Sequence, residues 1–319
     1  MIGGINLNTK YNILDWQEQL CEKYIVFRKK GNTCKASTER TIRAAIYSFF
    51  DYVNKREIED ISAIDAMDLK NWSINLTHLK IRVRNLYVSQ LRIFFEYLAE
   101  ENMVSTSLPV ALMYRHAPVT TVVEILDEEQ LSIINNYRIK ASTPMELRDI
   151  AIVLLGLRIG MRSGDICKLK LTDISWKDCT ISFEQEKTGV FVTLPLPTDV
   201  GNSLYQYITQ GRPQNSKSEQ IFLSHKPPYE GIKAKDTAVR SLKHIFLNKN
   251  IEMPKGFHIT RRTFASKMLC AGNSVDIIAT ALGHSSIHNV GSYLSTDDRN
   301  LRLCAIDCNK IEYKGVYDL

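Results

Sequence analysis

Residues 145–165 read MELRDIAIVLLGLRIGMRSGD, and this stretch decides the fold of the second half of the chain. Its first part, up to Ile159, is strongly apolar and predicts a helix at the centre of a hydrophobic core. Gly160 then breaks the helical pattern, and a new helix is expected to begin at Arg162. Asp165 follows three residues later, where a carboxylate can pair with an arginine and hold its guanidinium in place. The same spacing is also typical of an ordinary salt bridge on a helix surface.

The residues that follow predict a small β-structure and then more helices. Residues 179–183 and 191–194 have strand character, and the intervening turn at 186–189, Glu-Lys-Thr-Gly, is a hairpin signal. Pro195 and Pro197 end the second strand. Further helices are expected over residues 204–209, 238–248, 258–271 and 275–282.

The N-terminal part of the chain, residues 14–112, predicts a compact helical module. Apolar residues recur at helical spacing over 38–53, 65–76 and 82–98. The periodicity lapses near residues 115–121, where Pro118 breaks any helix, so we expect a linker there. Asp127 and Gln130 then have the spacing of a capping box at the start of the next helix.

These patterns indicate a mainly α-helical protein with a small β-hairpin or sheet. We expect a helical domain at residues 1–117 and a mixed α+β domain at 118–319.

Composition sets the broad class of the protein. With 44% hydrophobic and 24% charged residues among 319, wholesale disorder is excluded. The formal charge of +6 is spread evenly, with 16 basic against 13 acidic residues in 1–115 and 25 against 22 in the rest, so there is no basic tail. This excess permits nucleic-acid binding but does not by itself argue for it.

The cysteines and the N-terminus predict a cellular location. None of the seven cysteines forms a Cys-x-x-Cys pair or has zinc-finger spacing, so we interpret them as thiols in a reducing cytosol and expect no metal. No secretion signal is evident, and no apolar run approaches the roughly 20 residues of a membrane span. We therefore expect a cytoplasmic protein.

Two arginines, two histidines and a late tyrosine form a set suited to phosphoryl transfer. Arg162 and Arg261 can clamp a phosphodiester, and His258 and His284 can donate hydrogen bonds or move protons. The oxygen of Tyr293 can attack phosphorus. His258 and Arg261 are three residues apart, so they share a face near a helix N-terminus, which favours phosphate. Taken singly, each residue also fits a surface or core role, and the inference depends on their order and spacing.

Lys187 lies at the tip of the expected hairpin. A lysine in this position usually serves only solubility. It can also deliver a proton to a leaving alkoxide, which is a very poor leaving group without an acid.

The chain resembles the tyrosine recombinase (phage integrase) family. The resemblance covers roughly residues 124–295 and rests on several motifs together. The motifs are LGLRIGMRSGDICKL at 155–169, Lys187-Thr188-Gly189 in the hairpin, HITRRTFA at 258–265, and LGHSS at 282–286 followed by Tyr293.

Three positions depart from the family's commonest pattern. Arg262 stands where a second histidine is frequent, Asp165 replaces a glutamate, and Ile159 replaces a frequent threonine. None of these changes removes a reacting group, so we expect an active enzyme.

The resemblance implies a mechanism and its partners. Tyr293 would attack the scissile phosphate of duplex DNA and form a 3′-phosphotyrosyl link, with Arg162, Arg261 and His284 stabilising the phosphate. His258 would assist proton transfer, and Lys187 would protonate the leaving 5′-oxygen. No cofactor, ATP or metal is needed in such a reaction. Strand exchange would pass through a Holliday junction in a homotetramer on two DNA sites, with accessory DNA-binding proteins as further partners and a location at the nucleoid.

The N-terminal module resembles, more weakly, the family's core-binding domain, which implies a clamp on the other face of DNA. Basic residues on or before its helices are the candidates for phosphate contacts there. These candidates, each of which fits a solvated surface charge equally well, are Arg40, Arg43, Lys80, Arg82, Arg84 and Arg92.

The length favours a subclass. The helical module begins near the N-terminus, so the layout resembles Xer-type and simple transposon recombinases without an arm-binding domain. Residues 300–319 are expected to form a tail that packs on a neighbouring protomer and regulates assembly. Two alternatives remain open: a type IB topoisomerase-like enzyme that nicks and reseals one DNA, and a non-catalytic DNA-binding regulator of the same fold.

Overall fold

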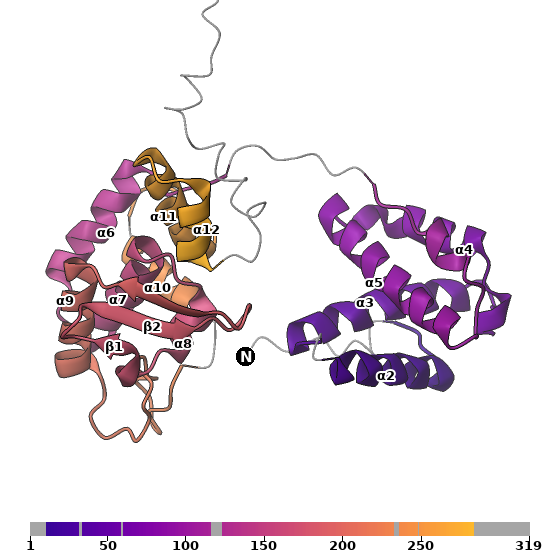
Figure 1. The fold of residues 1–319 in the computed structure, drawn as a ribbon, viewed down its shortest axis with the longest axis horizontal. Coiled ribbons are helices and arrows are strands. Elements are labelled where there is room, and N and C mark those ends of the chain that lie inside the picture. The colour runs from indigo at the N-terminus through magenta and orange to yellow at the C-terminus, as the bar shows by residue number, and fades with distance from the viewer. Residues whose placement is uncertain are drawn as a thin grey trace, which may run out of the picture. The chain divides into compact units, whose positions relative to one another are not determined.

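The computed structural model describes residues 11–31, 34–58, 60–115, 123–232, 236–247 and 249–283. The chain divides into two compact units, Met1–Val119 and Thr120–Leu319. The described part of the first unit is helical, and that of the second adds a small antiparallel sheet to its helices (Figure 1). The expected fold class, mainly α with a small β-structure, is confirmed.

The first unit is built from amphipathic helices around an aromatic core. Phe49 meets the rings of Trp72 and Phe95 edge to face, with centroids 5.8 and 5.4 Å away. This arrangement favours aromatic pairs beyond the area that they bury. The helices are α2 (Asp15–Lys30), α3 (Ala36–Asn54), α4 (Ala66–Asn75) and α5 (Ile81–Glu100), with 3₁₀ turns at Ile61–Ala63, Leu76–His78 and Leu108–Ala111.

The second unit is organised around α7 (Pro144–Arg158), which is buried without interruption from Leu147 to Leu157. Thr143 caps this helix in a capping box with Glu146, and Asp127 and Gln130 form the expected box on α6. The other elements are α6 (Glu128–Lys140), α8 (Ser163–Lys168), the 3₁₀ turn Leu171–Asp173, β1 (Ile174–Ser175), β2 (Thr180–Glu184), β3 (Phe191–Pro195), α9 (Thr198–Gln206), the π-helical turn Tyr207–Gly211, α10 (Asp236–Phe246), α11 (His258–Cys270) and α12 (Val275–Leu282). None of the described helices combines the length and apolarity needed to cross a membrane.

The sheet has the strand order β1-β2-β3, with both pairs antiparallel. Thr180 faces Pro195 at one end of the β2–β3 ladder, and Glu184 faces Phe191 at the other. Ile181 and Phe183 of β2 are buried, which gives the period of two expected of a strand with one covered face. The turn that carries Lys187 closes the end of the ladder at Glu184 and Phe191.

Helices α9, α10 and α11 pack on α7 (Figure 1). Gly156 permits the close approach of α11, because a Cβ at this position would lie 2.4 Å from Thr260 Oγ1 and 2.7 Å from the ring of Phe257. Gly160 follows α7 with a φ of +75°, and a Cβ there would lie 2.5 Å from Phe264. The glycine break seen in the sequence is thus where the chain turns against α11.

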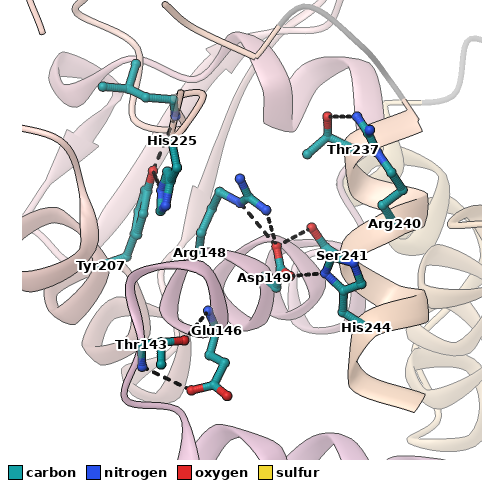
Figure 2. Close-up of polar contacts among 11 residues, drawn as sticks. Thr143, Glu146, Arg148, Asp149, Tyr207, His225, Thr237, Arg240, Ser241 and His244 are labelled. Carbon is teal, nitrogen blue, oxygen red and sulfur yellow. Dashed lines mark hydrogen bonds and ion pairs between the residues drawn. The ribbon is translucent and has the colours of Figure 1, made fainter. Parts of the chain in front are cut away.

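A buried carboxylate joins α7 to α10 (Figure 2). Asp149 is 1% exposed, and its Oδ1 accepts hydrogen bonds from Nη2 of Arg148 at 2.9 Å and from Oγ of Ser241 at 2.8 Å. Its Oδ2 lies 2.8 Å from Nδ1 of His244. Because a buried charge is tolerated only when it is paired and hydrogen-bonded, these contacts act as one unit.

Candidate active site

Arg162 enters the site from the N-terminal end of α8. Its Nη1 donates a 2.6 Å hydrogen bond to Oε1 of Gln185 and lies 3.9 Å from Oδ2 of Asp165. The side chain is 18% exposed, so it remains accessible from outside while its position is fixed by neighbours. The ion pair with Asp165 expected from the spacing is present but long.

Arg261 lies in the first turn of α11 and is 2% exposed. Its Nη1 donates to the carbonyl of Gly160 and its Nη2 to the carbonyl of Leu282, both at 2.7 Å. One guanidinium therefore ties together the turn after α7, the start of α11 and the end of α12. Planar and always charged, it is suited to such a fixed fork of donors.

Lys187 lies in the turn between β2 and β3. The backbone N–H of Gln185 donates to the carbonyl of Val190 at 2.9 Å, and that of Gly189 donates back to the carbonyl of Gln185 at 2.8 Å. Gly189 has a φ of +70°, which glycine adopts without strain. The turn is also anchored from outside, because the N–H of Glu186 donates to Oδ1 of Asp165 at 2.9 Å.

Asp165 thus contacts the lysine turn as well as Arg162. The residue is 4% exposed, and burial raises the pKa of its carboxyl. The Glu186 N–H, Arg162 and Arg261 oppose this rise in pKa. Its physical role is to hold the turn between β2 and β3 against the start of α8.

His258 begins α11, and partial burial together with nearby positive charges lowers its pKa. Desolvation of the ring is the largest cause, and together with the charges of Arg261, Arg262, Arg162 and Lys187 it lowers the pKa from 6.5 to about 4. The residue is still exposed, so water screens part of this effect. Cations from three separate segments of the sequence therefore contribute to the lowered pKa of this histidine.

Gln185 is a member of this site that the sequence did not indicate. It is 2% exposed, accepts from Arg162, and donates from Nε2 to the carbonyl of Leu282 at 3.0 Å. The only sequence signal is its place two residues before Lys187, and nothing in the pattern distinguishes it from a surface glutamine.

His284 and Tyr293 lie outside the described residues. The chain leads to them from the site, since Leu282, whose carbonyl accepts from Arg261, ends α12. Gly283 then adopts a left-handed conformation with φ 58°, as is common for a glycine that ends a helix.

The six candidates for DNA contact in the first unit fall into two groups. Arg40, Lys80 and Arg82 are exposed. The guanidiniums of the other three contact groups of their own unit. Arg43 pairs with Glu22 and Glu39, Arg84 donates to the carbonyls of Ser73 and Ile74, and Arg92 donates to the carbonyl of Leu112 and lies over the ring of Tyr114.

Within the described residues, no group of three or more His, Cys, Asp and Glu side chains is placed to hold a metal ion.

The sequence profile of the phage integrase family matches residues 124–300, more than half of the chain. The chain belongs to this family, whose members include the tyrosine recombinases. The matched region contains Arg162, Lys187, His258, Arg261, His284 and Tyr293.

Individual relatives are similar over different lengths of this integrase-family chain. "Putative integrase/recombinase y4gC" of Sinorhizobium fredii is 32% identical over 184 residues, which cover 57% of this chain and 94% of that protein. Tyrosine recombinase XerC of Leptospira interrogans is 23% identical over 89% of this chain and 91% of its own. Against two other Sinorhizobium fredii relatives, y4rA and y4rF, this chain spans less than two thirds of their length.

Among solved structures, the XerH site-specific recombinase bound to its palindromic difH substrate, in a post-cleavage complex, superposes with a TM-score of 0.68. The match covers 90% of this chain and 83% of XerH, at 18% identity. At this identity the match establishes a shared fold.

Proposed function

We propose that this protein is a site-specific DNA recombinase that cleaves and rejoins duplex DNA through a covalent bond to Tyr293. The observation that carries the proposal is a set of contacts that holds Arg162, Arg261 and the turn with Lys187 together. Gln185 accepts from Arg162 and donates to the Leu282 carbonyl, which also accepts from Arg261. Asp165 accepts from the N–H of Glu186, in the turn that carries Lys187. Family membership supports the same reaction class.

In the proposed reaction the Oη of Tyr293 attacks the scissile phosphorus. The bond from phosphorus to the 5′-oxygen breaks as the bond to Oη forms, so the products are a 3′-phosphotyrosine and a 5′-hydroxyl. Arg162 and Arg261 stabilise the charge that builds up on the non-bridging oxygens, because their donors are held in place before DNA binds. His284 adds a further donor.

Two side chains move the protons in this scheme. His258 has a lowered pKa, so it is neutral near pH 7 and able to accept the proton of the Tyr293 hydroxyl. The ammonium of Lys187 delivers a proton to the departing 5′-oxygen. One proton passes from Tyr293 to His258 and one from Lys187 to the 5′-oxygen, so the number of protons and the total charge stay constant.

The covalent intermediate conserves the energy of the phosphodiester bond, so rejoining requires neither ATP nor a metal. Attack by the 5′-hydroxyl of a second DNA then exchanges strands. Exchange between two duplexes implies a Holliday junction and a tetramer on two sites, for which residues 300–319 are the candidate contact between protomers.

The test begins with selection of a DNA site from a library of randomised duplexes, using the Tyr293→Phe variant as a binder that does not cleave. The selected duplex is then nicked next to the cleavage point, so that the fragment carrying the 5′-hydroxyl diffuses away and the covalent adduct accumulates. Wild-type protein is expected to give an adduct on a denaturing gel, and Tyr293→Phe none.

The outcomes separate the competing functions. Junctions between two duplexes establish recombination, whereas resealing of one duplex without junctions indicates a topoisomerase-like enzyme. Binding without any adduct from wild-type protein indicates a regulator and contradicts the proposal.

A further inference from the structure

The carboxamide of Gln185 contacts the segments that carry the candidate catalytic groups. Its Oε1 accepts a hydrogen bond from Nη1 of Arg162 at 2.6 Å and another from Oγ1 of Thr188 at 3.0 Å. Its Nε2 donates to the carbonyl of Leu282 at 3.0 Å. Both ends of the amide are therefore used, in a side chain that is 2% exposed.

The carbonyl of Leu282 is shared with the second arginine. It also accepts a 2.7 Å hydrogen bond from Nη2 of Arg261. A continuous path therefore runs from Arg162 through the Gln185 amide and the Leu282 carbonyl to Arg261. This path links the two guanidiniums through two neutral groups.

The chemistry of the partners fixes the orientation of the amide. An arginine offers only donors, so the atom that faces Arg162 is the oxygen, and a carbonyl only accepts, so the atom that faces Leu282 is the nitrogen. A carboxylate in place of the amide would lose the donor to Leu282. It would also place a negative charge beside Arg162, in competition with a phosphate.

The backbone around Gln185 limits the freedom of this amide. The same residue closes the turn that carries Lys187, through its N–H and its carbonyl. On the other side, Gly283 lies so close that a Cβ there would be 2.3 Å from Nε2 of Gln185. The amide is thus enclosed between the β2–β3 turn and the end of α12.

We propose that Gln185 is a positioning residue, which holds Arg162 and Arg261 at the spacing needed to bind the scissile phosphate without neutralising either charge. The inference rests on the proposed function, since it assigns both arginines to one phosphate. Two guanidiniums repel each other, and the neutral amide and carbonyl that link them offset this repulsion while leaving their positive charge for the DNA.

The test compares Gln185→Met, which keeps the length but loses all three side-chain hydrogen bonds, with Gln185→Glu, which keeps the acceptor and loses the donor. Glu184→Gln on the exposed side of β2 is the matched control. Single-turnover cleavage is measured on the selected nicked duplex, once with a normal scissile phosphate and once with a methylphosphonate. The latter lacks one charged oxygen and depends less on the spacing of the arginines.

On the normal phosphate, both Gln185 variants are expected to cleave about 10- to 100-fold more slowly than wild type, the scale for a small misplacement of catalytic groups. On the methylphosphonate the difference from wild type shrinks. Glu184→Gln cleaves both substrates at the wild-type rate.

Three results would overturn the inference. These are wild-type rates in Gln185→Glu, wild-type rates in Gln185→Met, or an equal loss on both substrates together with a lower urea midpoint, which would show that Gln185 only supports the fold. If the wild-type protein itself forms no adduct, the proposed function fails instead, so the two failures are distinguishable.

Discussion

His258 shows how the charges of neighbouring residues set the protonation state of a single side chain. Its pKa is lowered from 6.5 to about 4, first by desolvation and then by Arg261 and the other cations. Folding therefore favours the neutral ring. The stability that depends on this neutral ring is complete above pH 6.5 and is lost as the pH falls toward 4.

We expect the ring proton signals of His258 to titrate well below pH 6.5 in an NMR titration of the whole chain. Loss of one signal in His258→Asn identifies the residue. Arg262→Gln is the matched change, because it removes one of the charges that lower the pKa without touching the ring, and the titration should then move upward. A midpoint at 6.5 in the wild-type protein would contradict the lowering of the His258 pKa by desolvation and the neighbouring cations.

At the scale of elements, the contact of α7 with α10 depends on Asp149. Asp149→Ala removes the partner of Arg148, whose side chain is 10% exposed, and also the acceptor for Ser241. An arginine left buried without its carboxylate is costly, so we expect the free energy of unfolding to fall by about 3–5 kcal/mol. Urea unfolding followed by circular dichroism measures this change.

The control for Asp149 lies on the same helix. Arg158 at the end of α7 pairs with Asp199 at 2.9 Å, but its side chain is 43% exposed. Arg158→Gln is expected to change the free energy of unfolding by less than about 1 kcal/mol, as for other surface pairs. A similar loss in both variants would show that burial does not set the importance of the Asp149 contacts.

The helices with regular apolar spacing and clear end signals were predictable from the sequence. The prediction for 275–282 coincides with α12, and α7 differs from its predicted range by one residue at each end. The prediction failed for α9, which begins at Thr198 and not at 204. Only Val200, Ser203 and Leu204 of this helix are buried, too few to mark its start among polar residues. The two-residue strand β1 was missed for a similar reason, because it is fixed by pairing with β2.

In the site too, residues marked by a sequence pattern were predictable, and residues whose place depends on contacts distant in the sequence were not. Arg162, Lys187, His258 and Arg261 were predicted as site residues because their spacing matches a family pattern. Gln185 was not, since its role arises from contacts with Arg162 and Leu282, which are distant in the sequence. Sequence could not separate exposed from buried cations either, because burial of a residue such as Arg84 depends on how α4 and α5 pack.

At the scale of the whole molecule, the charge excess is small in both parts of the chain. Residues 1–115 carry 16 basic and 13 acidic side chains, and the remaining residues carry 25 and 22. Strong attraction to DNA therefore has to come from where the cations lie, because their net number is low.

Arg82 and Arg84 of α5 provide a matched pair for testing whether exposed cations of the first unit contact DNA phosphates. Arg82 is exposed, whereas Arg84 is 5% exposed and its Nε donates to the carbonyl of Ser73 at 2.7 Å. Each phosphate contact contributes about 0.9 to the slope of log affinity against log salt concentration. We expect Arg82→Gln to reduce that slope by about 1 on a duplex of arbitrary sequence, and Arg84→Gln to leave the slope unchanged while lowering the urea midpoint. Fluorescence anisotropy from 50 to 300 mM salt, roughly the range in which such binding weakens steeply, measures both slopes. Equal slopes for Arg82→Gln and wild type would show that Arg82 does not contact DNA phosphates. A reduced slope for a still folded Arg84→Gln would show that the buried guanidinium is released to DNA on binding.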